Sequence, residues 1–69
     1  MTKKQFLESL RGKPVHVDFM EDDNLSQVEG YLDFTIDPED PDNIALEIMS
    51  NKGYQKIDMS EVKKIYVKG

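Results

Sequence analysis

From Pro14 onward, apolar side chains recur at every second position in five short runs, and polar connections separate the runs. Alternation with a period of two places one side of each run in an interior and the other in water, which is typical of half-buried β-strands. The runs predict strands at about residues 14–20, 27–36, 43–49, 54–59 and 64–68. Because the connections are short, consecutive strands are expected to pair antiparallel.

Gly30 falls on the apolar side of the second predicted strand, in line with Leu32 and Phe34. A glycine inside a strand often marks a sharp bend or a close approach of two backbones. A sheet of five antiparallel strands with one such bend is expected to curl into a small barrel, which removes most exposed edges.

The residues before the first strand predict one amphipathic helix over about residues 2–11. Thr2 and Gln5 have the spacing of a capping box, and Gly12 and Pro14 follow as stop signals. The apolar side chains that share one helical face are Phe6, Leu7 and Leu10. A helix this short must pack on the strands to persist. The fold class is therefore mainly β with one N-terminal α-helix, in a single domain over residues 1–69.

The chain contains no cysteine, which excludes disulfides, thiolate metal sites and thiol nucleophiles. No run approaches the roughly 18 apolar residues of a membrane span, and no signal-peptide pattern opens the sequence. We therefore expect a cytoplasmic protein with no membrane partner.

Charge is distributed unevenly along the chain. The net charge is −5, yet residues 14–51 hold 11 acids and no lysine or arginine, whereas the two ends hold all nine basic residues and three acids. The middle is thus −11 and the ends +6. This pattern is typical either of a solvated surface or of a charge dipole that selects a partner. The candidate basic contact face consists of Lys3, Lys4, Arg11 and Lys13. An acidic middle repels phosphate, so nucleic acid is not favoured as a partner and could approach only the ends.

The acidic stretch DPEDPD, residues 37–42, indicates a loop between strands, because Pro38 and Pro41 cannot donate ladder hydrogen bonds. It lacks the glycine and closing glutamate of a calcium-binding loop, so no metal and no cofactor are expected. His16 is the only histidine, on the outward side of its strand, and no serine lies in a nucleophile motif. With no paired acids in an apolar pocket either, no catalytic residue is predicted and the chain is not expected to be an enzyme.

The order of these elements, together with two motifs, resembles the Sm-like family of small barrels, which includes bacterial RNA chaperones. FLESLRGKPVHV is similar to the helix and first strand of that family, and EVKKIYV to its closing turn and last strand. GYLDFTID…DNIAL is similar to its first sequence motif. The motif positions in this chain are Gly30, Leu32, Asp37, Asn43, Ile44 and Leu46. The resemblance implies a five-stranded SH3-like or Sm-like barrel, with Gly30 at the barrel bend.

In the family, the aspartate and asparagine of the first motif help to bind uridine-rich RNA beside basic residues of a second motif. The equivalents here are Asp37 and Asn43, but the second-motif region reads KIDMSEV and brings Asp58 and Glu61 where positive charge is expected. Added negative charge opposes phosphate binding. Asp37 and Asn43 are therefore interpreted as remnants of an RNA pocket that no longer works.

The resemblance also implies assembly, because Sm-like barrels form rings by pairing the fourth strand of one copy with the fifth of the next. The candidate assembly edge consists of Ile57, Ile65, Tyr66 and Val67. Lysines on both strands oppose edge pairing, so a monomer or weak dimer is favoured over a closed ring.

Two functions stay open. The first is a non-enzymatic binding or assembly module that acts through protein contact or self-association. The alternative is an acidic interaction or inhibitor protein, of a type that phages and mobile elements encode, that competes for a basic nucleic-acid-binding surface.

Overall fold

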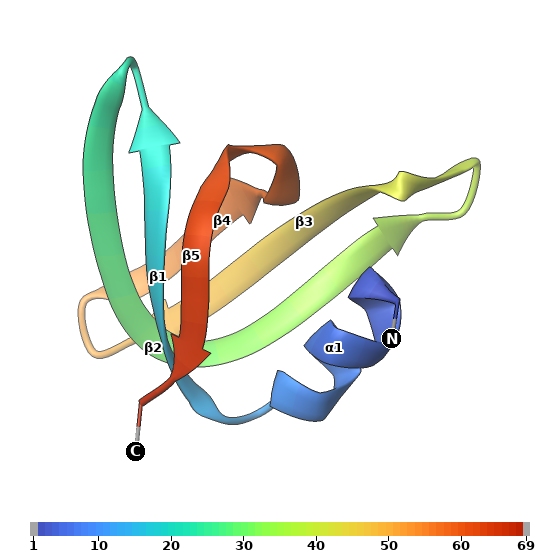
Figure 1. Ribbon diagram of the computed structural model, residues 1–69. Coiled ribbons are helices and arrows are strands. Elements are labelled where there is room, and N and C mark those ends of the chain that lie inside the picture. The colour runs from blue at the N-terminus through green and yellow to red at the C-terminus, as the bar shows by residue number, and fades with distance from the viewer. Residues whose placement is uncertain (1, 69) are drawn as a thin grey trace.

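The computed structural model describes residues 2–68, which form one N-terminal helix and a five-stranded antiparallel sheet (Figure 1). The elements are α1 (Lys3–Leu10), β1 (Pro14–Glu21), β2 (Asn24–Asp37), β3 (Asp40–Ser50), β4 (Gly53–Asp58), the 3-10 turn η1 (Met59–Glu61) and β5 (Val62–Val67). The prediction of a mainly β fold with one N-terminal helix is confirmed. The radius of gyration, 11.5 Å, is close to the roughly 11 Å expected of a compact chain of this length.

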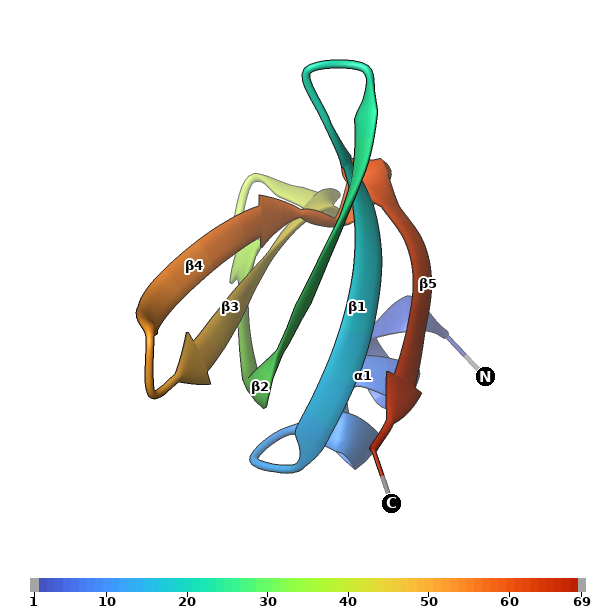
Figure 2. The ribbon, with the colours of Figure 1, turned by 90° about the vertical axis from the view of Figure 1, so that its left-hand side faces the viewer.

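The strand order is β4-β3-β2-β1-β5, so β4 and β5 are the two edges of the sheet. Within residues 2–68 no ladder joins these edges, and the sheet is not closed into a barrel. Closure and the Sm-like assignment thus remain predictions. Figure 2 shows β4 and β5 at opposite sides of the curved sheet.

Two connections are tighter than the sequence predicts. β1 and β2 are joined by Asp22 and Asp23 alone, both with positive φ (49° and 65°), which suits the two-residue turn of a twisted hairpin. β2 and β3 are joined by Pro38 and Glu39 alone, because pairing resumes between Asp37 and Asp40. The predicted loop over residues 37–42 is therefore wrong in its extent.

Pro41 lies inside β3, in a register irregularity. Ile36 pairs with Ile44 and Asp37 pairs with Asp40, so residues 41–43 have no partners on β2. A bulge of this kind tolerates proline, since no ladder hydrogen bond is required of it. The expectation that pairing lapses at Pro41 is confirmed locally, although the hairpin continues beyond it.

Gly30 marks the point where β2 passes from one partner to the other. β2 pairs with β1 up to Tyr31 and with β3 from Tyr31 onward, and Figure 1 shows the strand curving between these two parts. A Cβ built on Gly30 would lie 2.4 Å from the Met49 carbonyl oxygen and 2.8 Å from a methyl of Ile48. The predicted close backbone approach is confirmed, and any side chain at this position would force β2 and β3 apart.

The core fills the inward face of the curved sheet. Alternate residues of four strands contribute to it, as their spacing predicts, and α1 adds two leucines. The buried residues are Leu7, Leu10, Val15, Val17, Phe19, Leu32, Phe34, Ile44, Leu46, Ile48 and Ile57. On β5, Ile65 packs partly against this core, but Val67 is 40% exposed. Val67 pairs with buried Val15 and so lies on the inward side of the sheet, but it stays partly exposed because no further strand covers the β5 edge.

The helix is fixed at both of its ends. The Thr2 hydroxyl accepts from the Gln5 amide and the Gln5 side chain accepts from the Thr2 amide, each at 3.1 Å, so the predicted capping box is confirmed. After the helix, Gly12 has φ +79° and its amide donates to the Leu32 carbonyl at 2.8 Å. This link brings the chain from α1 into the sheet at the level where β2 changes partner.

Candidate functional site

Asp37 and Asn43, the predicted RNA-pocket remnants, lie together in one open hollow of about 600 Å³. Lys56 and Asp58 of the neighbouring strands line the same hollow, and the small side chain of Ala45 leaves room between them. The structure thus brings the two motif residues together, although they sit on either side of the β2–β3 turn.

The electrostatics of this hollow disfavour phosphate. Asp37 accepts a hydrogen bond from the Glu39 amide at 2.9 Å, and Asp58 accepts one from the Ser60 amide at 2.9 Å. The hydrogen bonds from Ser60 hold the pKa of Asp58 below its usual value, so this carboxylate is ionised at neutral pH. Against these two carboxylates stands one cation, Lys56, and the lining is net negative.

The predicted basic contact face is only partly free. Arg11 makes ion pairs with Asp33 at 3.2 Å and with Glu8 at 3.6 Å, and it donates to the Phe34 carbonyl at 3.3 Å. Its guanidinium carbon also lies 4.2 Å from the centroid of the Phe34 ring. Arg11 therefore acts as a link between α1 and β2. The remaining members of the predicted face are exposed: Lys3, Lys4 and Lys13.

The ladder geometry fixes which backbone groups are free at the sheet edges. Alternate residues of an edge strand direct their N–H and C=O groups toward the sheet, and the residues between them direct theirs outward. Ser50 and Gly53 flank a two-residue turn and so form a hydrogen-bonded pair, while the Lys68 amide donates to Pro14 at 2.9 Å. Counting from these pairs, the outward-directed backbone groups belong to Tyr54, Lys56 and Asp58 on β4 and to Ile65 and Val67 on β5.

The four predicted assembly residues fall into two groups. Ile57 is buried in the core, so its side chain is not available to a neighbour, and its backbone pairs with Leu46 of β3. Ile57 therefore offers no free group to a neighbour, and the assembly edge itself stays a prediction. Tyr66 and Val67 are exposed on β5, and Ile65 is half-buried there with its N–H directed outward. Both strands are edges, as predicted, but the available groups on β4 belong to other residues.

An ionic cluster on the outward side of β1, β2 and β5 surrounds His16. Its Nδ1 lies 2.8 Å from Glu29 Oε2, and its Nε2 lies 2.7 Å from Asp18 Oδ1. Lys68 donates to the other oxygen of Glu29 at 2.6 Å, and the Tyr66 ring stacks on the imidazole at 5.0 Å. Both ring nitrogens face carboxylates, which only accept when ionised, so this geometry fits the doubly protonated imidazolium.

The hydrogen bonds to Glu29 and Asp18 raise the pKa of His16 above its ordinary value of 6.5. In turn, the hydrogen bonds from Lys68 and His16 lower the pKa of Glu29. The sequence interpretation of His16 as a solvent-facing histidine missed this cluster. Asp18, two residues along the same strand face, could have been recognised, but Glu29 is its neighbour only through the β1–β2 register.

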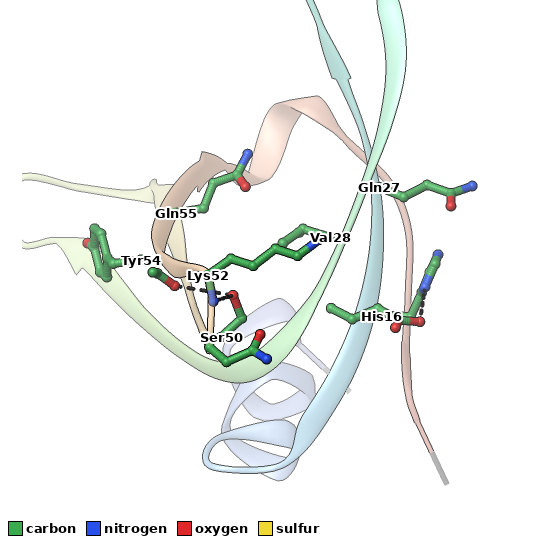
Figure 3. A pocket seen from close by; sticks show the side chains of 10 residues that line it. His16, Gln27, Val28, Ser50, Lys52, Tyr54 and Gln55 are labelled. Carbon is green, nitrogen blue, oxygen red and sulfur yellow. Dashed lines mark hydrogen bonds and ion pairs between the residues drawn. The ribbon is translucent and has the colours of Figure 1, made fainter.

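A second groove, of about 540 Å³, opens where β2 bends away from β3 (Figure 3). In that view it separates the β3–β4 turn, with Ser50 and Lys52, from β1 and β2, with His16 and Gln27. Val28 is the one aliphatic side chain in its lining, and no nucleophile with an adjacent base is among its lining residues. The groove therefore offers space without a recognisable set of catalytic groups.

In the described part of the chain, no group of three or more histidine, aspartate or glutamate side chains is placed to hold a metal ion. No helix among residues 2–68 is long and apolar enough to cross a membrane. In comparisons with known proteins, no protein-family model, no curated protein and no solved structure matches this chain.

Proposed function

We propose that this protein is a non-enzymatic binding or assembly module of the Sm-like type, which acts through protein–protein contact and has lost its uridine-RNA pocket. The observation that supports this proposal best is the pair of open edges. β4 and β5 end the sheet on opposite sides, and each directs a series of backbone donors and acceptors away from it. An open edge is the place where another chain adds a strand.

The Sm-like assignment is supported by the strand order and by the bend. A sheet ordered β4-β3-β2-β1-β5 has as its edges the two strands through which Sm-like barrels join one another. Gly30 sits in the strand that passes from one half of the sheet to the other. The loss of the RNA pocket is supported by the net negative hollow around Asp37 and Asn43.

The edges favour weak rather than tight pairing. Lys56 lies on the β4 edge and Lys63 and Lys64 lie on β5, and clustered lysines on short edge strands oppose pairing of like-charged edges. We therefore expect monomers in dilute solution and strand-paired dimers at high concentration. Salt screens the lysines and strengthens this association.

Light scattering at increasing protein concentration tests the proposal, with Lys56→Pro as the critical variant. Proline removes the outward N–H of Lys56 and leaves the ladder to β3 intact, since Lys56 directs its N–H away from that strand. We expect Lys56→Pro to stay folded and to remain monomeric where the natural chain dimerises. Lys56→Thr, which keeps the N–H and removes the charge, is the matched control and should associate more strongly. A natural chain that stays monomeric into the millimolar range would refute edge pairing.

The alternative, an acidic interaction or inhibitor protein, is favoured by one specific observation. The β2–β3 hairpin ends in four carboxylates with no cation between them: Asp37, Glu39, Asp40 and Asp42. Such a tip attracts a basic surface and repels nucleic acid from it. In this case the protein would displace nucleic acid from a basic partner, which a competition assay measures directly.

A further inference from the structure

Three large side chains lie next to one another on the outward side of the sheet and are open to water. They are Tyr31 on β2, Met49 on β3 and Tyr54 on β4, which are 60%, 51% and 54% exposed. Tyr31 pairs directly with Met49, and Met49 pairs directly with Tyr54. Directly opposed side chains have Cβ atoms about 5 Å apart, so these three form one continuous strip, here called the outer row.

No other part of residues 2–68 covers the outer row. The strand neighbours of these residues, such as Leu32 and Ile48, are buried on the opposite side of the sheet, and α1 packs on that same buried side through Leu7 and Leu10. Isolated exposed apolar residues are ordinary, but three large ones in register across three strands are typical of a surface that contacts another molecule.

The outer row borders two carboxylates, Asp33 and Glu47, of which Asp33 already pairs with Arg11 at 3.2 Å. One step along the strands, Asp33 pairs with Glu47, and Glu47 pairs with Lys56. Partial loss of water and the nearby carboxylates of Glu47 and Asp33 raise the pKa of Tyr54. Residues 31–58 together contain seven acids and two lysines, a net charge of −5, and most of the acids lie toward the hairpin tip.

We propose that the outer row is a docking site for a basic protein segment that carries arginine beside apolar side chains. Arginine stacks favourably on tyrosine rings, and its guanidinium also pairs with carboxylates in two parallel hydrogen bonds. Met49 between two tyrosines supplies an adaptable apolar contact. The acidic hairpin attracts the basic segment, and the outer row holds its apolar side chains.

This inference rests on the proposed protein-binding role but uses a sheet face, whereas the assembly proposal uses the backbone edges. A phosphate-rich ligand does not fit the outer row, since residues 31–58 carry a net charge of −5. Free tyrosine and methionine surface combined with negative charge instead matches a cationic, partly apolar peptide.

An NMR titration with a synthetic peptide of alternating arginine and leucine tests the site at physiological salt. We expect the Met49 methyl signal and the Tyr31 and Tyr54 amide signals to shift together. The double variant Tyr31→Thr/Tyr54→Thr, which keeps residues that favour strands, should weaken binding about tenfold. Leu25→Thr is the matched control, because Leu25 is equally exposed, at 60%, but lies at the far end of β2. It should leave the affinity unchanged.

Three outcomes would overturn the docking site: no binding of the peptide, binding that the double tyrosine variant leaves unchanged, or the same signals shifting with oligouridine. Light scattering on the double variant separates this inference from the assembly proposal, because the outer row is not needed for edge pairing. If the double tyrosine variant still self-associates and binds the peptide as well as the natural chain does, only the docking site is refuted. If the outer row binds the peptide but the natural chain never self-associates, only the edge-assembly proposal is refuted.

Discussion

The two halves of the sheet carry different kinds of side chain on their outward sides. In the β5 half, formed by β5, β1 and the first part of β2, the outward side chains bind one another around His16, and Lys68 ties the end of the chain to Glu29. In the β4 half, formed by the second part of β2 with β3 and β4, the outward side carries Tyr31, Met49 and Tyr54 without a cover.

The inward sides of the two halves are alike, since both bury alternating aliphatic and aromatic residues in one core. The two halves therefore differ in the outward side chains that remain exposed and available to other molecules. In the β5 half, the charges of His16, Asp18, Glu29 and Lys68 pair with one another, whereas the outer row of the β4 half is open to water. This contrast supports our proposal that the β4 half is the principal contact surface, with the backbone edge of β5 as the second.

The largest expected effect comes from Gly30, which lies where the two halves meet. Gly30→Ala places a Cβ within 2.4 Å of the Met49 carbonyl oxygen, so β2 and β3 must separate. Overpacking of this kind costs about 3 kcal/mol of unfolding free energy, a large fraction of the stability of a small domain. Urea denaturation measures the loss.

Gly12→Ala is the control for Gly30→Ala. Gly12 also has a backbone conformation that favours glycine, with φ +79°, but no atom lies within 4 Å of a Cβ built there. Its substitution should cost about 1 kcal/mol, from backbone strain alone. Equal losses at the two glycines would contradict the close approach at Gly30.

The next effect is a pH dependence specific to the β5 half. The pKa of His16 is raised in the folded chain by Glu29 and Asp18, so folding favours the protonated ring. The stabilisation is fully present below the unfolded-state pKa of about 6.5 and is lost as pH rises through the higher folded-state pKa. The stability advantage of the natural chain over His16→Gln should therefore shrink from mildly acidic to alkaline pH. A His16 NMR titration midpoint at or below 6.5 would contradict the cluster.

The smallest expected effect on stability concerns the outer row. Tyr31→Thr and Tyr54→Thr remove exposed rings and keep β-branched residues that favour strands, so each should change the unfolding free energy by only about 0.5 kcal/mol. Thermal melting of the two variants measures this. A loss of several kcal/mol would show that the row supports the fold, and the contrast between the halves would then fail.

Much of the fold follows from local patterns in the sequence. Period-two alternation predicts that Val15, Val17 and Leu46 face inward, and the spacing of Thr2 and Gln5 predicts the cap. The turns were harder to predict. Two-residue turns with positive φ usually contain glycine, and since none is present, the tight turn at Asp22 and Asp23 looks like a longer polar loop in sequence.

The candidate sites depend on register, which alternation alone does not give. The resemblance to the Sm-like motif grouped Asp37 and Asn43 in one site, and the two residues share a hollow. Glu29 meets His16, and Tyr31 meets Met49, only through the way in which β2 pairs on both of its sides. Whether the sheet closes into a barrel also depends on long-range geometry. Val67 is partly exposed because the sheet is open at the β5 edge.

Residue-resolved amide hydrogen exchange at increasing protein concentration tests the central claim, that open strand edges are the contact groups, most directly. In dilute solution we expect the outward-directed amides of Tyr54, Lys56, Ile65 and Val67 to exchange fast, while Gln55, Ile57 and Tyr66 are protected by the sheet. At high concentration the first set should gain protection together. Protection of the Tyr54 and Lys56 amides already in the dilute monomer, or fast exchange of both at every concentration, would contradict the account.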